Sequence, residues 1–313
     1  MGRARALAAG LRRFRASRPG TEALPTPLEE AFYLLQEAEQ GARPLTERLR
    51  ILGLMATTLD HFFVAELAPC QEGSLPSSVP ALSAARAESV RRLLTQASRL
   101  LQRELLPHLE ELGVFVTQPE QLTGEQQAWL RRYFQEQVFP VITPLAVDPG
   151  RPFPFISSHS LNLLVALDVG GGRLHPSQAY ARIKVPRVIP RFVPVLAPIH
   201  RRIYVLSEAL VRFFLADLFP ALPVRAAYSF RVLRIDHCPP RLTDPASLPR
   251  LVSGRRPSPV ARLDVEVGMP LPWQRWLQGH LAASPALSFE LEPPLGMHCL
   301  VELANSVEGW PVP

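Results

Sequence analysis

The chain has 313 residues, of which 47% are hydrophobic, and this composition excludes a wholly disordered protein because enough apolar surface exists to offset the entropy of ordering. The formal net charge of +6 predicts a surface that attracts polyanions such as nucleotides or phosphate polymers, although a solvated basic face without a ligand is the commoner meaning of such a charge. No run approaches the ~18 apolar residues of a membrane span, and three scattered cysteines do not form a disulfide framework, so we expect a protein of the reducing cytoplasm.

The N-terminal segment 1–24 is rich in arginine, and its first 20 residues carry no acidic side chain. It has no long apolar core of the kind that a signal peptide requires. We therefore predict a disordered basic tail, with a polyanion-binding arm as the sharper alternative.

Helical periodicity dominates residues 25–113, which we predict to be an N-terminal helical domain. Apolar residues at spacings of three and four form one stripe, and they include Leu45, Leu49, Leu52, Met55, Leu59 and Phe62. A second long helix is predicted from about Leu82, with Pro107 bending it and Gly113 ending it.

In residues 114–303 short β-like runs alternate with helical segments, and this pattern predicts an α+β domain with mainly antiparallel strands. A C-terminal tail is predicted over 304–313. A helix is expected to begin at Thr123, whose spacing to Gln126 is that of a capping box, and another to be capped by Ser207. The β-like runs include LNLLVALDV and QAYARIKVPRV, joined by a turn at Gly170–Gly172, and AYSFRVLRI and VARLDVEV, whose arginines we expect to alternate outward to solvent.

Several kinds of site are disfavoured by the residues themselves. Lys184 is the sole lysine and does not follow a glycine, so a phosphate-binding loop of the Walker type is excluded. The dipeptides His237–Cys238 and His298–Cys299 could in principle share a zinc ion, but strand neighbours point to opposite faces, so no metal site is predicted.

The stretch VFPVITPLAVDPGRPFPFISSHSLNLLVAL and the following ARIKVPRVIPRFVPV closely resemble the head domain of the type 1 polyphosphate kinases. The upstream PLTERLRILGLMATTLDHFFVAELA resembles the N-terminal helical domain of that family, and the resemblance runs over roughly residues 26 to 300. Within the stretch, a structural role for His159 and Asn162 is favoured over a ligand role.

This resemblance implies that two phospholipase D-like domains, absent from these 313 residues, hold the phosphorylated histidine, the magnesium site and most phosphate-binding side chains of the family. We therefore expect no catalytic residue and no cofactor on this chain, because the family binds ATP with Mg²⁺ mainly through those domains. The family asparagine near adenine corresponds to Thr58, which is the one candidate nucleotide-binding residue. At Glu66, which replaces a family arginine, a carboxylate would repel phosphate.

Two functions follow from the resemblance. The first is a catalytically inactive relative of polyphosphate kinase that acts as a binding or dimerisation module in polyphosphate metabolism. Its partners would be polyphosphate or nucleotide, a second copy, or a full-length polyphosphate kinase paired through the head domain, and neither a membrane nor a specific nucleic acid is expected. The alternative is one half of a split polyphosphate kinase, which lengthens polyphosphate from ATP with a catalytic histidine on another chain.

Overall fold

The structure, a computed structural model, describes residues 26–67, 84–147, 153–170, 178–235 and 258–310. The arginine-rich segment 1–24, the glycines at 171–172, the dipeptide His237–Cys238 and the side chain of Glu66 lie outside the described residues.

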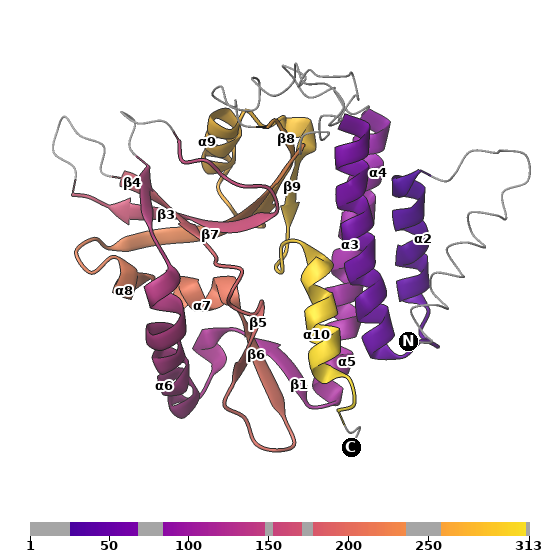
Figure 1. Ribbon diagram of the computed structural model, residues 1–313, viewed down its shortest axis with the longest axis horizontal. Coiled ribbons are helices and arrows are strands. Elements are labelled where there is room, and N and C mark those ends of the chain that lie inside the picture. Colours follow the sequence, from indigo (N-terminus) through magenta and orange to yellow (C-terminus); the bar gives the residue numbers. More distant parts are fainter. Residues whose placement is uncertain (1–25, 68–83, 148–152, 171–177, 236–257, 311–313) are drawn as a thin grey trace, which may run out of the picture.

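Three long helices lie side by side at one end of the molecule (Figure 1). Thr26 caps the first of them, because its hydroxyl accepts a hydrogen bond from the Glu29 amide in a capping box. The predicted apolar stripe of the second is confirmed, since five of its six residues are buried and Leu45 is partly buried. The helices are α2 (Pro27–Glu39), α3 (Leu45–Leu67) and α4 (Ala84–Leu100).

The chain continues from α4 through one widened π turn, η1 (Leu101–Leu105), into α5 (Leu106–Glu111). Pro107 has no amide hydrogen, so it cannot continue the regular hydrogen-bond ladder, and the turn before it widens so that the Leu106 amide bonds to the Leu101 carbonyl. Gly113 then ends the helix with a φ of +77°, as predicted.

A three-stranded sheet of order β1-β6-β5 lies below the larger sheet in Figure 1. Its strands β1 and β6 are parallel, and β5 and β6 are antiparallel. Helix α6 begins after Thr123, whose capping box with Gln126 is confirmed. The elements of this part are β1 (Val114–Thr117), η2 (Pro119–Gln121), α6 (Gly124–Tyr133), the π turn η3 (Phe134–Val138), η4 (Phe139–Val141), β5 (Phe192–Val195), β6 (Arg202–Leu206), α7 (Ser207–Phe213) and α8 (Leu215–Leu218).

The larger sheet has six strands in the order β2-β4-β3-β7-β8-β9, and only the β8–β9 pair is parallel. The predicted α+β class with mainly antiparallel strands is therefore confirmed. Its elements are β2 (Leu145–Val147), β3 (Ser160–Asp168), β4 (Gln178–Lys184), β7 (Val224–Arg234), β8 (Val260–Glu266), α9 (Leu271–Leu281), η6 (Pro285–Leu287) and β9 (Ser288–Leu291).

Both faces of this sheet are covered, which explains why β3 is buried over nearly its whole length. Leu163 and Val165 pack into the main core, whereas Leu164 faces the cluster formed with α9. The prediction that the strand arginines alternate outward is wrong, because neither face is open to solvent: Arg231, Arg234 and Arg262 are 2%, 6% and 3% exposed.

Two further expectations are corrected near the helix ends. Ser207 does not cap its helix, because the N-cap is Leu206 and the Ser207 hydroxyl contacts the Glu208 carboxylate instead. The segment expected to be a tail from residue 304 is still helical there: η7 (Met297–Cys299) leads into α10 (Leu300–Val307), which buries Leu303, Ala304 and Val307 against its surroundings and lies beside α3.

Candidate functional site

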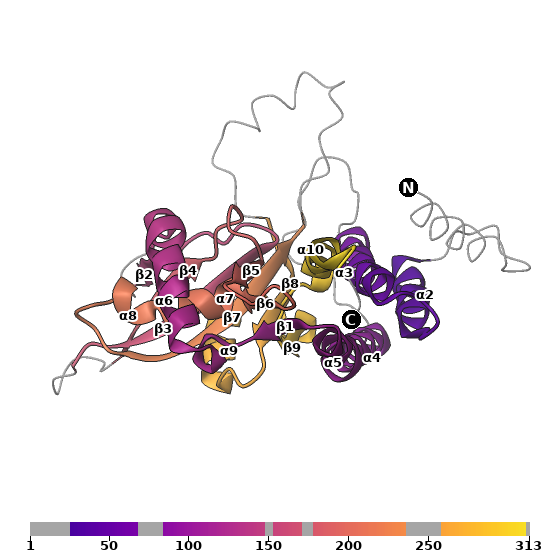
Figure 2. The same ribbon diagram turned by 90° about the horizontal axis from the view of Figure 1, so that it is seen from below.

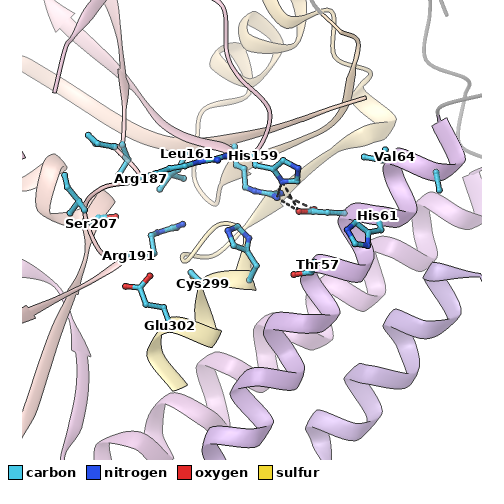
Figure 3. Close-up of a pocket in the computed structure, with 17 residues that line it drawn as sticks. Thr57, His61, Val64, His159, Leu161, Arg187, Arg191, Ser207, Cys299 and Glu302 are labelled. Carbon is cyan, nitrogen blue, oxygen red and sulfur yellow. Dashed lines mark hydrogen bonds and ion pairs between the residues drawn. The ribbon is translucent and has the colours of Figure 1, made fainter. Parts of the chain in front are cut away.

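A cleft of about 870 Å³ lies where α3 faces the segment 185–191 that precedes β5. Figure 3 shows Thr57, His61 and Val64 on the α3 side and Arg187, Arg191 and Ser207 on the opposite side. His159 closes one end of the cleft, and Cys299 and Glu302 lie at the other.

Helix α3 brings Thr57, Asp60, His61 and Val64 to one wall, because residues three and four apart share a helix face. The Thr57 hydroxyl is occupied locally, since it donates to the Gly53 carbonyl at 3.1 Å. Asp60 instead points away from its helix and contacts the sheet.

A buried ion-pair network fixes this wall to the sheet. Arg231 on β7 donates from Nη1 to Asp60 Oδ1 at 3.3 Å and to Asp264 Oδ2 at 3.1 Å, and it also donates from Nη2 to Asp60 Oδ2. Arg262 donates from Nε to Asp264 Oδ1 at 2.6 Å and lies 3.6 Å from Asp60 Oδ1. Arg231 and Asp264 are directly opposed on neighbouring strands, so the strand register builds the pair.

The network shifts the ionisation of its members. Burial alone would raise the pKa of Asp60, but Arg231, the hydrogen bond to His159 and Arg262 outweigh it and hold the pKa well below 3.8. Burial alone would lower the pKa of Arg231, yet the Asp60 and Asp264 carboxylates outweigh it and raise that pKa. Asp60 and Arg231 therefore both remain charged at neutral pH.

A second buried pair lies across the cleft. Arg191 donates from Nε and Nη2 to the two carboxylate oxygens of Glu208 at 2.8 and 2.6 Å, and its Nη2 also donates to the Leu295 carbonyl. Glu302 accepts a hydrogen bond from the Phe192 amide at 3.3 Å. Burial raises the pKa of the nearby Cys299 thiol to about 12, so this cysteine stays protonated and is a poor nucleophile.

Two histidines of the cleft have unusual surroundings. His159 is held in the left-handed region at a φ of +56°, with its Nδ1 3.2 Å from Arg231 Nη2 and 3.5 Å from Asp60 Oδ2. Enclosure by the cleft walls, together with Arg231, lowers the pKa of His298 to about 4, although its ring is still reached by solvent.

The residues singled out from sequence are distributed unevenly around this cleft. Thr58 is 9% exposed and does not line the cleft, whereas its neighbour Thr57 does, so a nucleotide contact by Thr58 stays a prediction. Asn162 is fully buried and accepts from Arg182 Nε at 2.8 Å, which is the structural role favoured for it. His159 contacts the buried network, in keeping with the structural role favoured for it, and it also lines the cleft, so a ligand role stays a prediction.

Sequence reasoning missed the cleft residues His61, Arg187, Arg191 and His298 as a group. They lie far apart in the chain, and only the fold brings them together. The alternation of arginine with apolar residues does not indicate which arginines form ion pairs with carboxylates. Among the described residues, no three His, Cys, Asp or Glu side chains are placed so that they could share a metal ion.

The matched families identify the architecture. The model of the polyphosphate kinase N-terminal domain matches residues 31–117, and that of the polyphosphate kinase middle domain matches residues 125–303. The chain belongs to the polyphosphate kinase family. The expected family membership is thus confirmed, and the cleft lies between segments contributed by both matched regions.

Relatives in this family extend well beyond the matched part. The polyphosphate kinase of Thermosynechococcus vestitus is 34% identical over 300 residues, which cover 90% of this chain and 40% of that protein. Polyphosphate kinase 1 of Chlorobaculum tepidum is 30% identical over 296 residues, covering 87% of this chain and 41% of that protein. This chain therefore spans about two fifths of the length of these polyphosphate kinases.

The fold is also that of a solved member. The crystal structure of polyphosphate kinase from Porphyromonas gingivalis superimposes with a TM-score of 0.72 at 22% identity, covering 91% of this chain and 41% of that one. Within the part of the chain that the structure describes, no helix is both long and apolar enough to cross a membrane.

Proposed function

We propose that this chain is a binding module of polyphosphate metabolism, which holds a phosphate-bearing ligand, polyphosphate or a nucleotide, without transferring phosphate by itself. The observation that carries the proposal is the open cleft between the two matched regions, where Arg187 faces the ligand space. Arg187 is exposed and donates to the Ser158 carbonyl at 3.3 Å, and it has no carboxylate partner among the described residues. Its guanidinium therefore remains available to an anion.

The charge arrangement supports binding rather than catalysis. Phosphoryl transfer relies on concentrated positive charge around the transferred group. Arg191 and Arg231, which also line the cleft, are already neutralised by Glu208 and by Asp60 with Asp264. A cleft of this kind can hold an anion moderately, but it offers little unpaired charge for stabilising a transition state.

An assembly role is part of the same proposal. Large apolar side chains are exposed on the second matched region, among them Phe155, Val188 and Ile199 at 62%, 80% and 96% exposure. Such side chains could contribute to contact with a second copy or with a full-length polyphosphate kinase. Size-exclusion chromatography with light scattering, alone and with the full-length kinase of the same host, tests this; separate elution at micromolar concentrations would contradict it.

A split kinase is the second candidate, and the observation that favours it is that the chain spans only about 40% of its relatives. In that case a second polypeptide would supply the catalytic histidine. Its prediction is that polyphosphate synthesis from ATP appears only when that polypeptide is added.

One experiment tests the binding-module proposal directly. The purified 313-residue chain is titrated with fluorescently labelled polyphosphate and, in parallel, incubated with γ-labelled ATP and Mg²⁺. We expect saturable polyphosphate binding and no labelled protein or polymer. Label transferred to this chain alone would overturn the binding-module proposal, and so would the absence of any binding.

A further inference from the structure

Three histidines from three separate elements line the cleft: His61 on α3, His159 just before β3 and His298 on η7. All three rings are exposed to solvent or partly so, and Figure 3 shows His61 and His159 close to the α3 wall. Histidine is the side chain whose ordinary titration falls near neutral pH, and His298, whose pKa is lowered to about 4, gains a proton near neutral pH only when a bound anion favours its charged form.

The permanent charges of the cleft cancel. On the α3 side, Arg231 and Arg262 are balanced by Asp60 and Asp264 in the buried network. On the opposite side, Arg191 is balanced by Glu208.

The remaining permanent charges of the lining are those of Arg187 and Glu302, which are opposite in sign. With neutral imidazoles the described groups therefore sum to about zero. The protonation of the histidines then decides whether the cleft carries a net positive charge.

The backbone conformation and the hydrogen bonds of His159 fix its position at the cleft. Its backbone adopts the left-handed conformation, which non-glycine residues rarely take, and the His159 amide bonds to the Val232 carbonyl at 2.8 Å. Its Nδ1 faces Asp60 and Arg231, so when Nδ1 is protonated it can donate to the Asp60 carboxylate. No described residue bonds to Nε2, which leaves that nitrogen for a ligand.

The ionisation of His298 is influenced by the charges of Arg231 and Asp60 as well. Partial enclosure and the positive charge of Arg231 disfavour its imidazolium, and Asp60 only partly offsets them. Arg191 and His159 add to that repulsion. A doubly charged anion placed among these groups would reverse the balance, so binding of the anion and protonation of His298 favour each other.

We propose that the cleft binds a phosphate group of its ligand with uptake of protons by His61, His159 and His298, while Arg187 supplies the permanent positive charge. This inference rests on the proposed function, since it names the site and the pH dependence of the same binding. The affinity for phosphate-bearing anions should therefore rise as the pH falls from 8 to 6. Each proton taken up steepens the dependence by at most about tenfold per pH unit.

The test is isothermal titration calorimetry with tripolyphosphate at several pH values between 6 and 8. Sulfate serves as a second probe because its own charge is constant over this range. At pH 6.5, titrations in two buffers of different ionisation enthalpy give the number of protons taken up. We expect a three- to tenfold gain in affinity per pH unit, with proton uptake for sulfate as well as for tripolyphosphate.

The decisive variant is the triple change His61→Gln, His159→Asn and His298→Gln, in which asparagine is chosen because it tolerates the left-handed backbone. It should bind with an affinity nearly independent of pH when sulfate is the probe. The control is His108→Gln, because His108 lies on α5 outside the cleft lining and 3.6 Å from Glu111, and it should retain the full pH dependence. If the triple variant does not fold, the single variant His61→Gln is measured instead, and its affinity for sulfate should depend less steeply on pH than that of the wild type.

The outcomes separate the two proposals. If polyphosphate binds but the triple variant shows the wild-type pH dependence, the histidine site is wrong and the proposed function stands. If neither probe nor polyphosphate binds at any pH, both are wrong. A pH-independent affinity of the wild-type chain for sulfate would likewise overturn the proton-linked site.

Discussion

Arg231 is one of the two largest fully buried side chains among the described residues, yet it carries a charge. Two carboxylates bind its terminal nitrogens, and one of them, Asp60, belongs to the helical part of the chain. Its Nε has no hydrogen-bond partner among the described residues, and a Cβ at position 296 would lie 2.9 Å from it, so Gly296 is needed for the close approach of the backbone. Close packing against the backbone of Gly296 therefore fixes the Arg231 side chain in addition to its ion pairs.

Replacement of Arg231 by methionine should lower the free energy of unfolding by about 3–5 kcal/mol, because Asp60 and Asp264 would be left buried without their main counter-charge. Urea denaturation followed by fluorescence measures the change. The control is Arg225→Met, which removes an exposed ion pair with Asp168 at 2.7 Å and should leave the midpoint nearly unchanged. Equal midpoints for the two variants would contradict the structural role of the network.

Asp60 makes the stability depend on acid. Its pKa in the folded protein lies below its ordinary value of 3.8, so its contribution is fully present above that value and is lost as the pH falls below it. The difference in unfolding free energy between wild type and Asp60→Asn should therefore shrink from pH 5 to pH 2, by at most about 1.4 kcal/mol per pH unit. Urea titrations at each pH measure it; a constant difference would show that the pKa of Asp60 is the same in the folded and unfolded states.

At this scale the sequence predicted part of the site and missed the rest. The structure buries Asp60 and the arginines that bind it, although those arginines were expected in solvent. Strand alternation places Arg231 and Leu233 on the same face, and only the packing of the helices on that face shows that it is not exposed. His61, His159 and His298 come from segments separated by long stretches of chain, so no local pattern could have joined them.

Among the secondary-structure elements, the contact between α3 and α10 depends on Gly53. A Cβ at this position would lie 2.8 Å from Cγ2 of Val301, so the two helices approach closely where α3 has no side chain. Figures 1 and 2 both place α10 beside α3. The close approach is how α10, at the end of the described chain, is joined to the N-terminal helices.

The change Gly53→Ala should destabilise the protein by about 1–3 kcal/mol through overpacking, even though alanine favours helix over glycine. Adding Val301→Ala should recover much of the loss, because it removes the methyl group that clashes. The matched control is Gly279→Ala in α9, where nothing lies within 4 Å of the new Cβ and a gain of up to about 1 kcal/mol is expected. Thermal unfolding of the wild type and these three variants measures the changes; a stabilised Gly53→Ala would contradict the close packing.

Elements were predicted better than their contacts. The apolar stripe of α3, the capping box of α6 and the long strand β3 carry strong local signals, and the structure confirms them. Helix α10 was missed because its sequence, LVELANSV, is short and its second half, from residue 304, was assigned to a tail. Its burial depends on α3, more than 200 positions earlier in the chain by the numbering of the two helices.

For the whole molecule, the main hydrophobic cluster runs without interruption from the helices to both sheets. It contains residues of α2, α3 and α4 together with residues of β3, β6 and α10. The Asp60–Arg231 pair crosses the same boundary. Although family models match two separate regions, the packing gives the helical part no separate core of its own.

We therefore expect the two parts to unfold together. All four tryptophans (Trp129, Trp273, Trp276 and Trp310) lie outside α2–α5, so their fluorescence reports the second part of the chain. Pulsed hydrogen exchange of peptides from α2–α4 reports the first, and both should give the same urea midpoint in the wild type. In Arg231→Met the helical peptides should exchange at lower urea than the fluorescence change, since the buried pair across the boundary is gone. Helical peptides that already unfold first in the wild type would show that the shared core does not couple the two parts.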